Sequence, residues 1–326
     1  MKRIIAVLMI IALSLSVFTA CTNNEEEQRL NELSERMLQY NTKKRGLESD
    51  IAKAWKEYDQ TLSGGECCFT LFVDNMTRNL IEEVYPLLTD FSFKATVVMS
   101  DGEMPGEKGC ISKNDYDKLI RAGWDFAIGS GSVDYKSENS VELLKKYLED
   151  YKLKLEENGY EMPKTFAFSE KQYDEKYIDL LLEYGFNVVR HFGEAGSKYS
   201  YSIERNGLYL LGSGRICADK TTMKADMQNA YKEKSTYSAT VRCIDDVYAD
   251  EELDCSVVKY ELMLDFIEDE CDEAHIFTAT ELYDYKTNTL SGSENFMTEF
   301  EKKIATLEKE LSEVNEELKK IHASLE

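Results

Sequence analysis

The sequence predicts an α/β protein built on a parallel sheet, and two observations support this prediction. Apolar runs typical of buried strands occur at Cys67–Asn75, Lys94–Ser100 and Trp124–Ser130. Amphipathic helical patterns at 79–91 and 114–123 separate them, so that strand and helix alternate as in a sheet covered by helices. Because such folds carry their chemistry at the carboxyl ends of the strands, we expect functional residues in the loops that follow these runs.

The same alternation continues toward the C-terminus. A helical pattern from 142 ends at Gly159, a residue type that often terminates helices. The later predicted elements are a strand at 164–169, a helix at 174–185, strands at 186–192, 207–217 and 239–246, a helix at 256–272 and a closing strand at 275–285. Without its terminal segments, a chain of 326 residues has the length of roughly one domain, which we place at 66–290.

The acidic end of the first strand, the KAT of the second and the run RAGWDFAIGS at 121–130 carry a resemblance to a known family. They are similar to the polysaccharide deacetylase family, whose NodB-homology domain has the patterns T-F-D-D-G and G-H-E-I-G-S-H-T. The resemblance implies a distorted (β/α)7 barrel over about 66–285. It also implies a groove Arg and Pro that are absent from 166–170, and a final Leu-x-His whose place is taken by Thr278–Thr280.

The reaction centre implied by the resemblance is largely missing. Asp74 matches the retained metal ligand, whereas Val73 stands at the position of the catalytic base. Gly131 and Tyr135 stand at the positions of the two metal-binding histidines. One carboxylate cannot hold a catalytic transition metal firmly, since such sites use three or four well-placed ligands. We therefore expect no intact catalytic residue and no cofactor.

Several side chains are expected to line a cleft at the strand ends. The candidates are Asp74, Ser130, Ser132, Asp134, Tyr135 and His191. A rebuilt enzyme site at Asp74, Asp134 and His191, holding a divalent metal, is the alternative to a non-catalytic cleft. A calcium site that adds Asp101, Asp245 and Asp246 is a further alternative, although acidic residues in so acidic a chain more often form a solvated rim.

Charge and the N-terminus indicate export. The chain has 39 basic and 62 acidic residues, and loss of Lys2 and Arg3 in a cleaved segment takes its net charge from −23 to −25. Such a charge disfavours nucleic acid and anionic membrane surfaces. Residues 1–20 read as a signal peptide that ends in Thr19-Ala20-Cys21, which resembles a bacterial lipobox. Cys21 is then lipidated, and the protein is anchored at the cell membrane, facing away from the cytoplasm.

Two helical arms flank the predicted barrel, at 21–65 and 291–326. Each has apolar residues at alternating spacings of three and four, which is the pattern of a coiled coil; Lys44 interrupts the first. Because one amphipathic helix cannot bury its stripe alone, each arm needs a partner. Pairing within the chain gives a stalk, and pairing between chains gives a dimer; both stay open.

Seven cysteines follow Cys21, and none forms a C-x-x-C pair. An odd number cannot all be bridged within one chain, and a zinc cluster is not indicated. A bridge between Cys217 and Cys243 stays open, since an exported compartment permits disulfides.

The sequence thus favours an exported, lipid-anchored protein with a degenerate deacetylase-like barrel that binds a cell-surface glycan or an envelope protein. The alternatives are an active carbohydrate deacetylase with a rebuilt site and an envelope scaffold whose coiled coil is the functional part.

Overall fold

The computed structural model describes residues 24–100, 102–169, 172–192, 202–205, 208–215, 220–244, 254–290 and 294–325. The predicted signal peptide, Cys21, Asp101, Cys217, Asp245 and Asp246 lie outside the described residues. The chain divides into two compact units. One contains Met1–Ala54 and Glu299–Glu326, and the other contains Trp55–Thr298.

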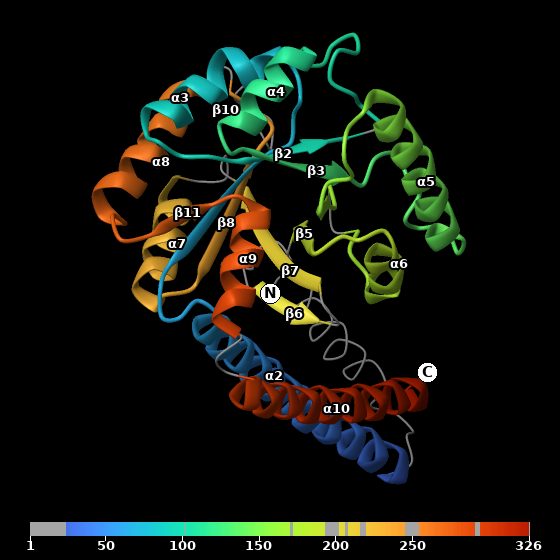
Figure 1. The fold of residues 1–326 in the computed structure, drawn as a ribbon. Coiled ribbons are helices and arrows are strands. Elements are labelled where there is room, and N and C mark those ends of the chain that lie inside the picture. Colours follow the sequence, from blue (N-terminus) through green and yellow to red (C-terminus); the bar gives the residue numbers. More distant parts are fainter. Residues whose placement is uncertain are drawn as a thin grey trace. The chain divides into compact units, whose positions relative to one another are not determined.

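In the described part of the second unit, seven parallel strands pair in a closed ring (Figure 1). In order around the ring they are β1 (Cys68–Val73), β2 (Thr96–Met99), β3 (Asp125–Gly129), β4 (Thr165–Ala167), β5 (Val188–Phe192), β7 (Leu208–Arg215) and β8 (Thr236–Val241). The last strand closes the ring because β8 pairs with β1 over its whole length, from Cys68 opposite Thr236 to Val73 opposite Val241. The predicted barrel is therefore confirmed.

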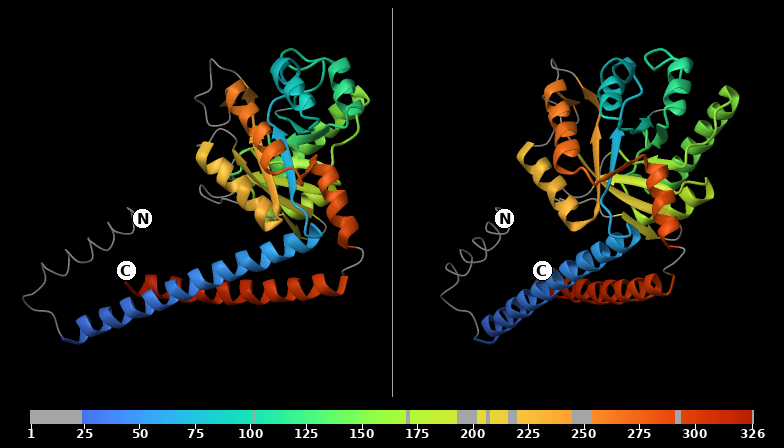
Figure 2. Two further views of the ribbon diagram at one scale, coloured as in Figure 1. Left: turned by 90° about the vertical axis from the view of Figure 1, so that its left-hand side faces the viewer. Right: turned by 60° about the vertical axis from the view of Figure 1, so that its left-hand side comes forward.

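Helices cover the outside of this barrel, as the views in Figure 2 show. They are α3 (Tyr85–Asp90), α4 (Lys113–Arg121), α5 (Ser140–Asn158), η2 (Glu175–Tyr177), α6 (Ile178–Glu183), α7 (Lys220–Glu233) and α8 (Val257–Glu270). Their ends follow local sequence rules. Ser112 and Asp115 form a capping box that begins α4, and Gly159 ends α5 with φ 75°, the left-handed conformation that favours glycine.

The predicted helix at 79–91 begins with a π-helical segment, η1 (Leu80–Val84), before α3. The backbone N–H of Tyr85 donates to the carbonyl of Leu80, five residues earlier. Pro86 follows within the first turn of α3. Because proline has no N–H and its ring crowds the carbonyl four residues earlier, a locally widened turn accommodates it.

The prediction of a closing strand at 275–285 is wrong. Only β11 (His275–Phe277) is a strand, and α9 (Ala279–Leu290) follows it. The Thr278 hydroxyl accepts from the backbone N–H of Glu281, and the Glu281 carboxylate accepts from the N–H of Thr278. This capping box starts a helix within the segment that had been predicted as a strand. β11 pairs with β1 from Cys68 to Thr70, at the amino end of the barrel, so Thr278–Thr280 lie away from the carboxyl ends.

Three further short strands are β6 (Ser202–Arg205), β9 (Cys243–Ile244) and β10 (Asp254–Cys255). β6 pairs antiparallel with β7, and β9 pairs with β10 apart from the barrel.

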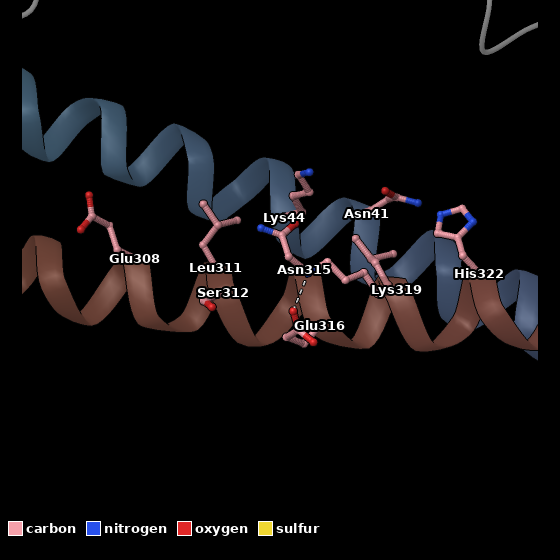
Figure 3. Close-up of a pocket in the computed structure, with 10 residues that line it drawn as sticks. Asn41, Lys44, Glu308, Leu311, Ser312, Asn315, Glu316, Lys319 and His322 are labelled. Carbon is pink, nitrogen blue, oxygen red and sulfur yellow. Dashed lines mark hydrogen bonds and ion pairs between the residues drawn. The ribbon is translucent and has the colours of Figure 1, made fainter. Parts of the chain in front are cut away.

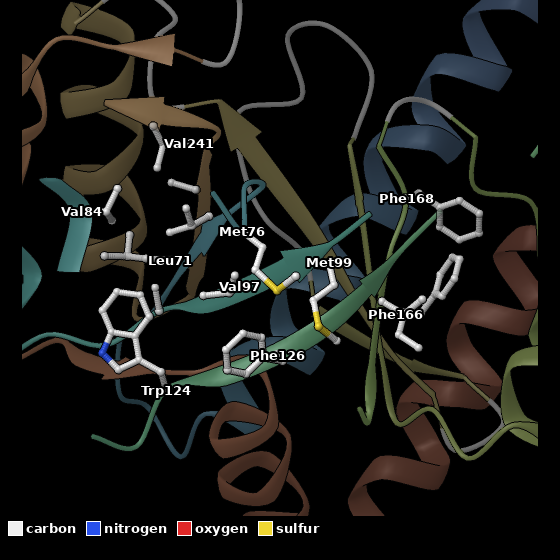
Figure 4. Packing of buried hydrophobic residues seen from close by; sticks show 14 of the residues in the cluster. Leu71, Met76, Val84, Val97, Met99, Trp124, Phe126, Phe166, Phe168 and Val241 are labelled. Carbon is white, nitrogen blue, oxygen red and sulfur yellow. The ribbon is translucent and has the colours of Figure 1, made fainter. Parts of the chain in front are cut away.

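Alternate strand residues face two different environments. On β1, Phe69, Leu71 and Val73 belong to the large apolar cluster between barrel and helices, part of which Figure 4 shows. Thr70 and Phe72 face the other side, the interior of the barrel. This outer cluster buries most of the apolar side chains of the unit, so the main hydrophobic core surrounds the barrel.

In the other unit, α2 (Asn24–Leu62) and α10 (Glu294–Leu325) lie side by side in both views of Figure 2. Leu47, Val314 and Leu318 form their shared buried cluster. The two helices run in opposite directions in Figure 2, and Nη2 of Arg36 lies 3.7 Å from Oε2 of Glu317. None of the described helices is long and apolar enough to cross a membrane.

Lys44, the polar residue in the predicted stripe, lines a hollow of about 690 Å³ between these two helices. Asn41 of α2 and Ser312, Asn315 and His322 of α10 also line it (Figure 3). The hollow marks the stretch where polar side chains replace apolar contacts between the helices.

Candidate functional site

An ion pair lies at the carboxyl end of the barrel. Asp74 follows β1, and its backbone N–H donates to the carbonyl of Val241 at 2.8 Å. Its side chain is 10% exposed, and Oδ1 lies 2.5 Å from Nη1 of Arg190 on β5. Arg190 is completely buried. Because its guanidinium stays charged in proteins, a carboxylate in this position compensates a charge that would otherwise be very costly to bury.

Two further oxygen atoms accept hydrogen bonds from the same guanidinium. Nη1 donates to Thr240 Oγ1 at 3.1 Å, and Nη2 donates to the carbonyl of Phe168 at 2.9 Å. The guanidinium carbon also lies 5.2 Å from the ring centre of Phe72 and 4.7 Å from that of Phe192. These contacts bring β1, β5, β8 and the residue after β4 together around one charge.

The barrel interior near this ion pair is polar. Ser213 and Thr240 share a hydrogen bond of 2.7 Å, and the hydroxyl of Ser238 donates to that of Ser213 at 3.2 Å. Buried hydroxyls that bond to one another or to a charged group avoid most of the cost of leaving water. Thr70 and Thr165 are also completely buried, but their Oγ1 atoms have no hydrogen-bond partner among the described residues. The barrel interior thus combines a bonded cluster at Ser213, Ser238 and Thr240 with two hydroxyls that bear the cost of burial.

The loop after β3 is fixed by buried hydroxyl groups. Ser130 is completely buried, with its Oγ 2.5 Å from Ser169 Oγ and 2.9 Å from Gln172 Oε1. The Tyr147 hydroxyl donates to the carbonyl of Gly129 at 2.9 Å. Gly131 has φ +57°, and a Cβ added there would meet the Tyr147 ring at 2.7 Å. A side chain at position 131 would thus need both a strained backbone and a displaced Tyr147.

Tyr135 is half-buried at the same end of the barrel. Its hydroxyl donates to the carbonyl of Ser130 at 3.0 Å. Its ring packs edge to face on Phe168 and Tyr177, with 5.5 Å between ring centres in each case. Burial raises the pKa of the Tyr135 hydroxyl far above its ordinary value. The hydroxyl therefore acts as a neutral donor that holds the loop.

The structure places the other predicted residues apart from the ion pair. His191 follows Arg190 on β5, so its side chain points to the opposite face of the strand. There its ring stacks on Tyr173, with 5.1 Å between ring centres, and burial lowers the pKa of His191 to about 4. Val73 is buried in the cluster between barrel and helices. Ser132 and Asp134 are exposed, and Asp134 Oδ1 accepts from the N–H of Lys136 at 3.0 Å.

Sequence reasoning missed Arg190. One signal was available: in the run Val188–Phe192, a charged residue interrupts a strand that is otherwise apolar or aromatic. A charge in a buried strand requires a partner, because charged residues are rarely buried unpaired. Its partner is 116 residues away in the sequence, so the pattern alone could not name Asp74.

The deacetylase fold implies a metal ion, but the described residues do not fit one. Asp74, the matched ligand, is bound to Arg190. Gly131 cannot accept a side chain without displacing Tyr147, and the Tyr135 hydroxyl is bound to Ser130. Across the part of the chain that the structure describes, no three His, Cys, Asp or Glu side chains gather into a group that could hold a metal ion. We assign no reaction step to a metal here.

No protein-family model matches the chain, and no curated protein sequence matches it significantly. Solved structures resemble it at low identity. Peptidoglycan deacetylase PdaC from Bacillus subtilis is 11% identical, with a TM-score of 0.41, over 72% of this chain and 97% of that chain. The Xyl-CE4 domain of a multidomain xylanase from the hindgut metagenome of Trinervitermes trinervoides is 11% identical, with a TM-score of 0.41, over 68% of this chain and 92% of that chain.

A mutant of a CE4 family pseudoenzyme with restored enzymatic activity is 9% identical, with a TM-score of 0.41, over 68% of this chain and 68% of that chain. Similarity at this level assigns no activity, ligand or partner to this chain.

The strand pairing itself defines the class of fold. In the described residues it closes a parallel barrel of seven strands with helices outside, as the resemblance to polysaccharide deacetylases implies. The barrel fold that the resemblance implies is thus confirmed.

Proposed function

We propose that this chain is an exported, lipid-anchored protein whose barrel binds a cell-surface glycan or an envelope protein without catalysing a reaction. The observation that carries the proposal is the state of the three positions matched to the metal ligands of deacetylases. Asp74 is held by a buried arginine, position 131 is closed by Tyr147, and Tyr135 is bound to its own loop. Asp74 and Tyr135 thus already have bonded partners within the barrel, and position 131 has no space for a side chain. This arrangement supports a barrel without a metal centre.

A glycan is the ligand class that suits the exposed end of the described barrel. Tyr135 and Tyr173 are half-buried aromatic residues in the loops after β3 and β4, and Ser132 and Asp134 are exposed beside Tyr135. Aromatic surfaces with a few polar groups are a common composition of binding sites for small organic ligands. The net charge of −23 disfavours a strongly anionic ligand.

Anchoring rests on the sequence around Cys21, which lies outside the described residues. The antiparallel packing of α2 and α10 within one chain supports a stalk that begins at the anchor. Metabolic labelling with a palmitate analogue tests the anchor. We expect label on the wild type and none on Cys21→Ala, which should be released from the membrane fraction; equal labelling of both would refute anchoring at Cys21.

Catalysis is tested on the purified full chain. We expect no stoichiometric bound metal by elemental analysis, and no acetate released from acetylated chitooligosaccharide or peptidoglycan with added zinc, manganese or cobalt. Turnover that depends on bound metal would overturn the proposal in favour of a deacetylase with a rebuilt site.

Binding is tested by sedimentation with insoluble peptidoglycan and chitin. We expect the wild type to cosediment and Tyr173→Ala to bind at least several-fold more weakly. Tyr160→Ala is the matched control, because Tyr160 is a half-buried tyrosine just before β4, at the other end of the barrel. Equal binding by all three proteins would place the ligand elsewhere. No binding by the wild type would leave an envelope protein as the partner class and refute the glycan.

A further inference from the structure

Arg190 has the surroundings of a bound ion. Its side chain has no exposed surface, and three oxygen atoms of three kinds accept from its guanidinium: a carboxylate, a hydroxyl and a backbone carbonyl. This mixture of oxygen donors is the set that hard cations prefer in proteins. Here the charge is delivered by a side chain from β5 and needs no ion from solution.

The three acceptors come from separate parts of the barrel. Asp74 follows β1, Thr240 lies on β8, and Phe168 follows β4. Together with β5 they lie at the carboxyl end of the closed ring, where strand pairing ends and the loops begin. A charge bound to all three therefore holds the mouth of the barrel in one arrangement.

We propose that the Arg190 guanidinium is a tethered cation, which takes beside Asp74 the place that a metal ion has in the deacetylases this barrel resembles. The mouth of the barrel is then stabilised by the chain itself, at any concentration of free metal. A divalent ion would have to enter next to a buried positive charge and displace it from Asp74, which repulsion between like charges opposes. This inference goes beyond the proposed function and holds whether or not the barrel binds a glycan.

Chemical rescue tests the inference on the full chain. Arg190→Ala removes the cation and leaves Asp74 buried without its partner, and loss of one member of a buried pair lowers the unfolding midpoint of a unit of this size by roughly 10 °C. The fluorescence of Trp55 and Trp124 follows the midpoint, since both tryptophans of the chain belong to the barrel unit. We expect guanidinium chloride at low millimolar concentration to recover several degrees in Arg190→Ala, saturably and relative to equal sodium chloride.

The matched control is the double variant Asp74→Ala/Arg190→Ala, which lacks the counter-charge and should not respond to guanidinium. Wild type should not respond either, because its site is filled. Equal responses of the single and double variants, or no response of the single variant, would overturn the inference.

A second measurement does not depend on the folding of a variant. Wild type should show the same midpoint, within about 1 °C, in EDTA and in millimolar calcium, manganese or zinc, because its cation is covalently attached. A saturable rise of several degrees with any of these metals, abolished by Asp74→Asn, would show that a free cation takes the place beside Asp74 and would refute the tethered cation.

Discussion

The amino end of the barrel contains a second buried ion pair, which allows a sharp prediction. Lys286 of α9 and Asp59 of α2 are both 1% exposed, with Nζ 2.7 Å from Asp59 Oδ1. Nζ also donates to Thr236 Oγ1 at 2.7 Å and to the hydroxyl of Ser63. The backbone N–H of Thr236 donates to the other Asp59 oxygen at 2.9 Å. α2, α9 and the start of β8 are thus joined around one charge pair.

We expect Lys286→Met to destabilise the barrel unit by about 3–5 kcal/mol, because it removes the positive charge that lies 2.7 Å from a buried carboxylate. For a unit of this size the unfolding midpoint falls by about 10 °C. Asp59→Asn should cost a similar amount, since it leaves a buried ammonium group. The double variant should be less destabilised than the sum of the two, because both charges are then gone. Urea unfolding followed by tryptophan fluorescence measures all four proteins.

The half-exposed pair Lys94 and Glu281 provides the control. Lys94→Met removes one member of an ion pair in contact with water, so its cost should stay below about 1 kcal/mol. A cost for Lys286→Met as small as that of Lys94→Met, or strict additivity in the double variant, would contradict the role given to burial.

Three further predictions concern single residues. Burial and the nearby arginine lower the pKa of His191 from 6.5 to about 4, so this side chain is neutral in the folded state near pH 6. The free energy of unfolding should therefore fall by on the order of 3 kcal/mol as the pH drops from about 6.5 to 4. His191→Phe should lack this part of the loss in acid unfolding curves. Gly131→Ala should destabilise by about 2–4 kcal/mol in urea, since positive φ and the Tyr147 ring both oppose a Cβ. Leu47→Ala should loosen the α2–α10 pair by about 2–4 kcal/mol, seen as lost helical circular dichroism or faster proteolysis.

Each of these variants has a counterpart elsewhere in the chain. His275→Phe replaces an exposed histidine, and the loss of stability attributed to His191 should persist in this variant. Gly159→Ala keeps the positive φ but meets nothing within 4 Å, so it should cost only about 1 kcal/mol. Leu38→Ala removes a side chain that is 69% exposed and should change little. Equal behaviour of a variant and its counterpart would contradict the cause given: burial for His191, the contact with Tyr147 for Gly131, and helix pairing for Leu47.

Patterns within a few residues were sufficient to predict the strands of the barrel and most of the helices around it. They did not predict α7, α9, β6 or β10. Alternating apolar runs and amphipathic segments predicted a parallel sheet, and Gly159 marked the end of α5. The resemblance to polysaccharide deacetylases implied that this sheet closes into a barrel. The segment 275–285 was wrongly predicted as a strand, because the capping box of Thr278 and Glu281 starts a helix there. The sequence does contain the signal for this box, a Thr followed three residues later by Glu.

Only the tertiary structure decided which charges meet. Arg190 finds Asp74 across 116 residues, and Lys286 finds Asp59 across 227, because barrel closure and strand register bring those positions together. The resemblance implied a histidine at position 131, where this chain has glycine, but it did not predict that the Tyr147 ring closes the space where a side chain would lie. The physical reason is the separation of the interacting residues along the sequence. Periodicity and helix caps depend on residues a few positions apart, whereas burial and ion pairing depend on how strands distant in the sequence are aligned.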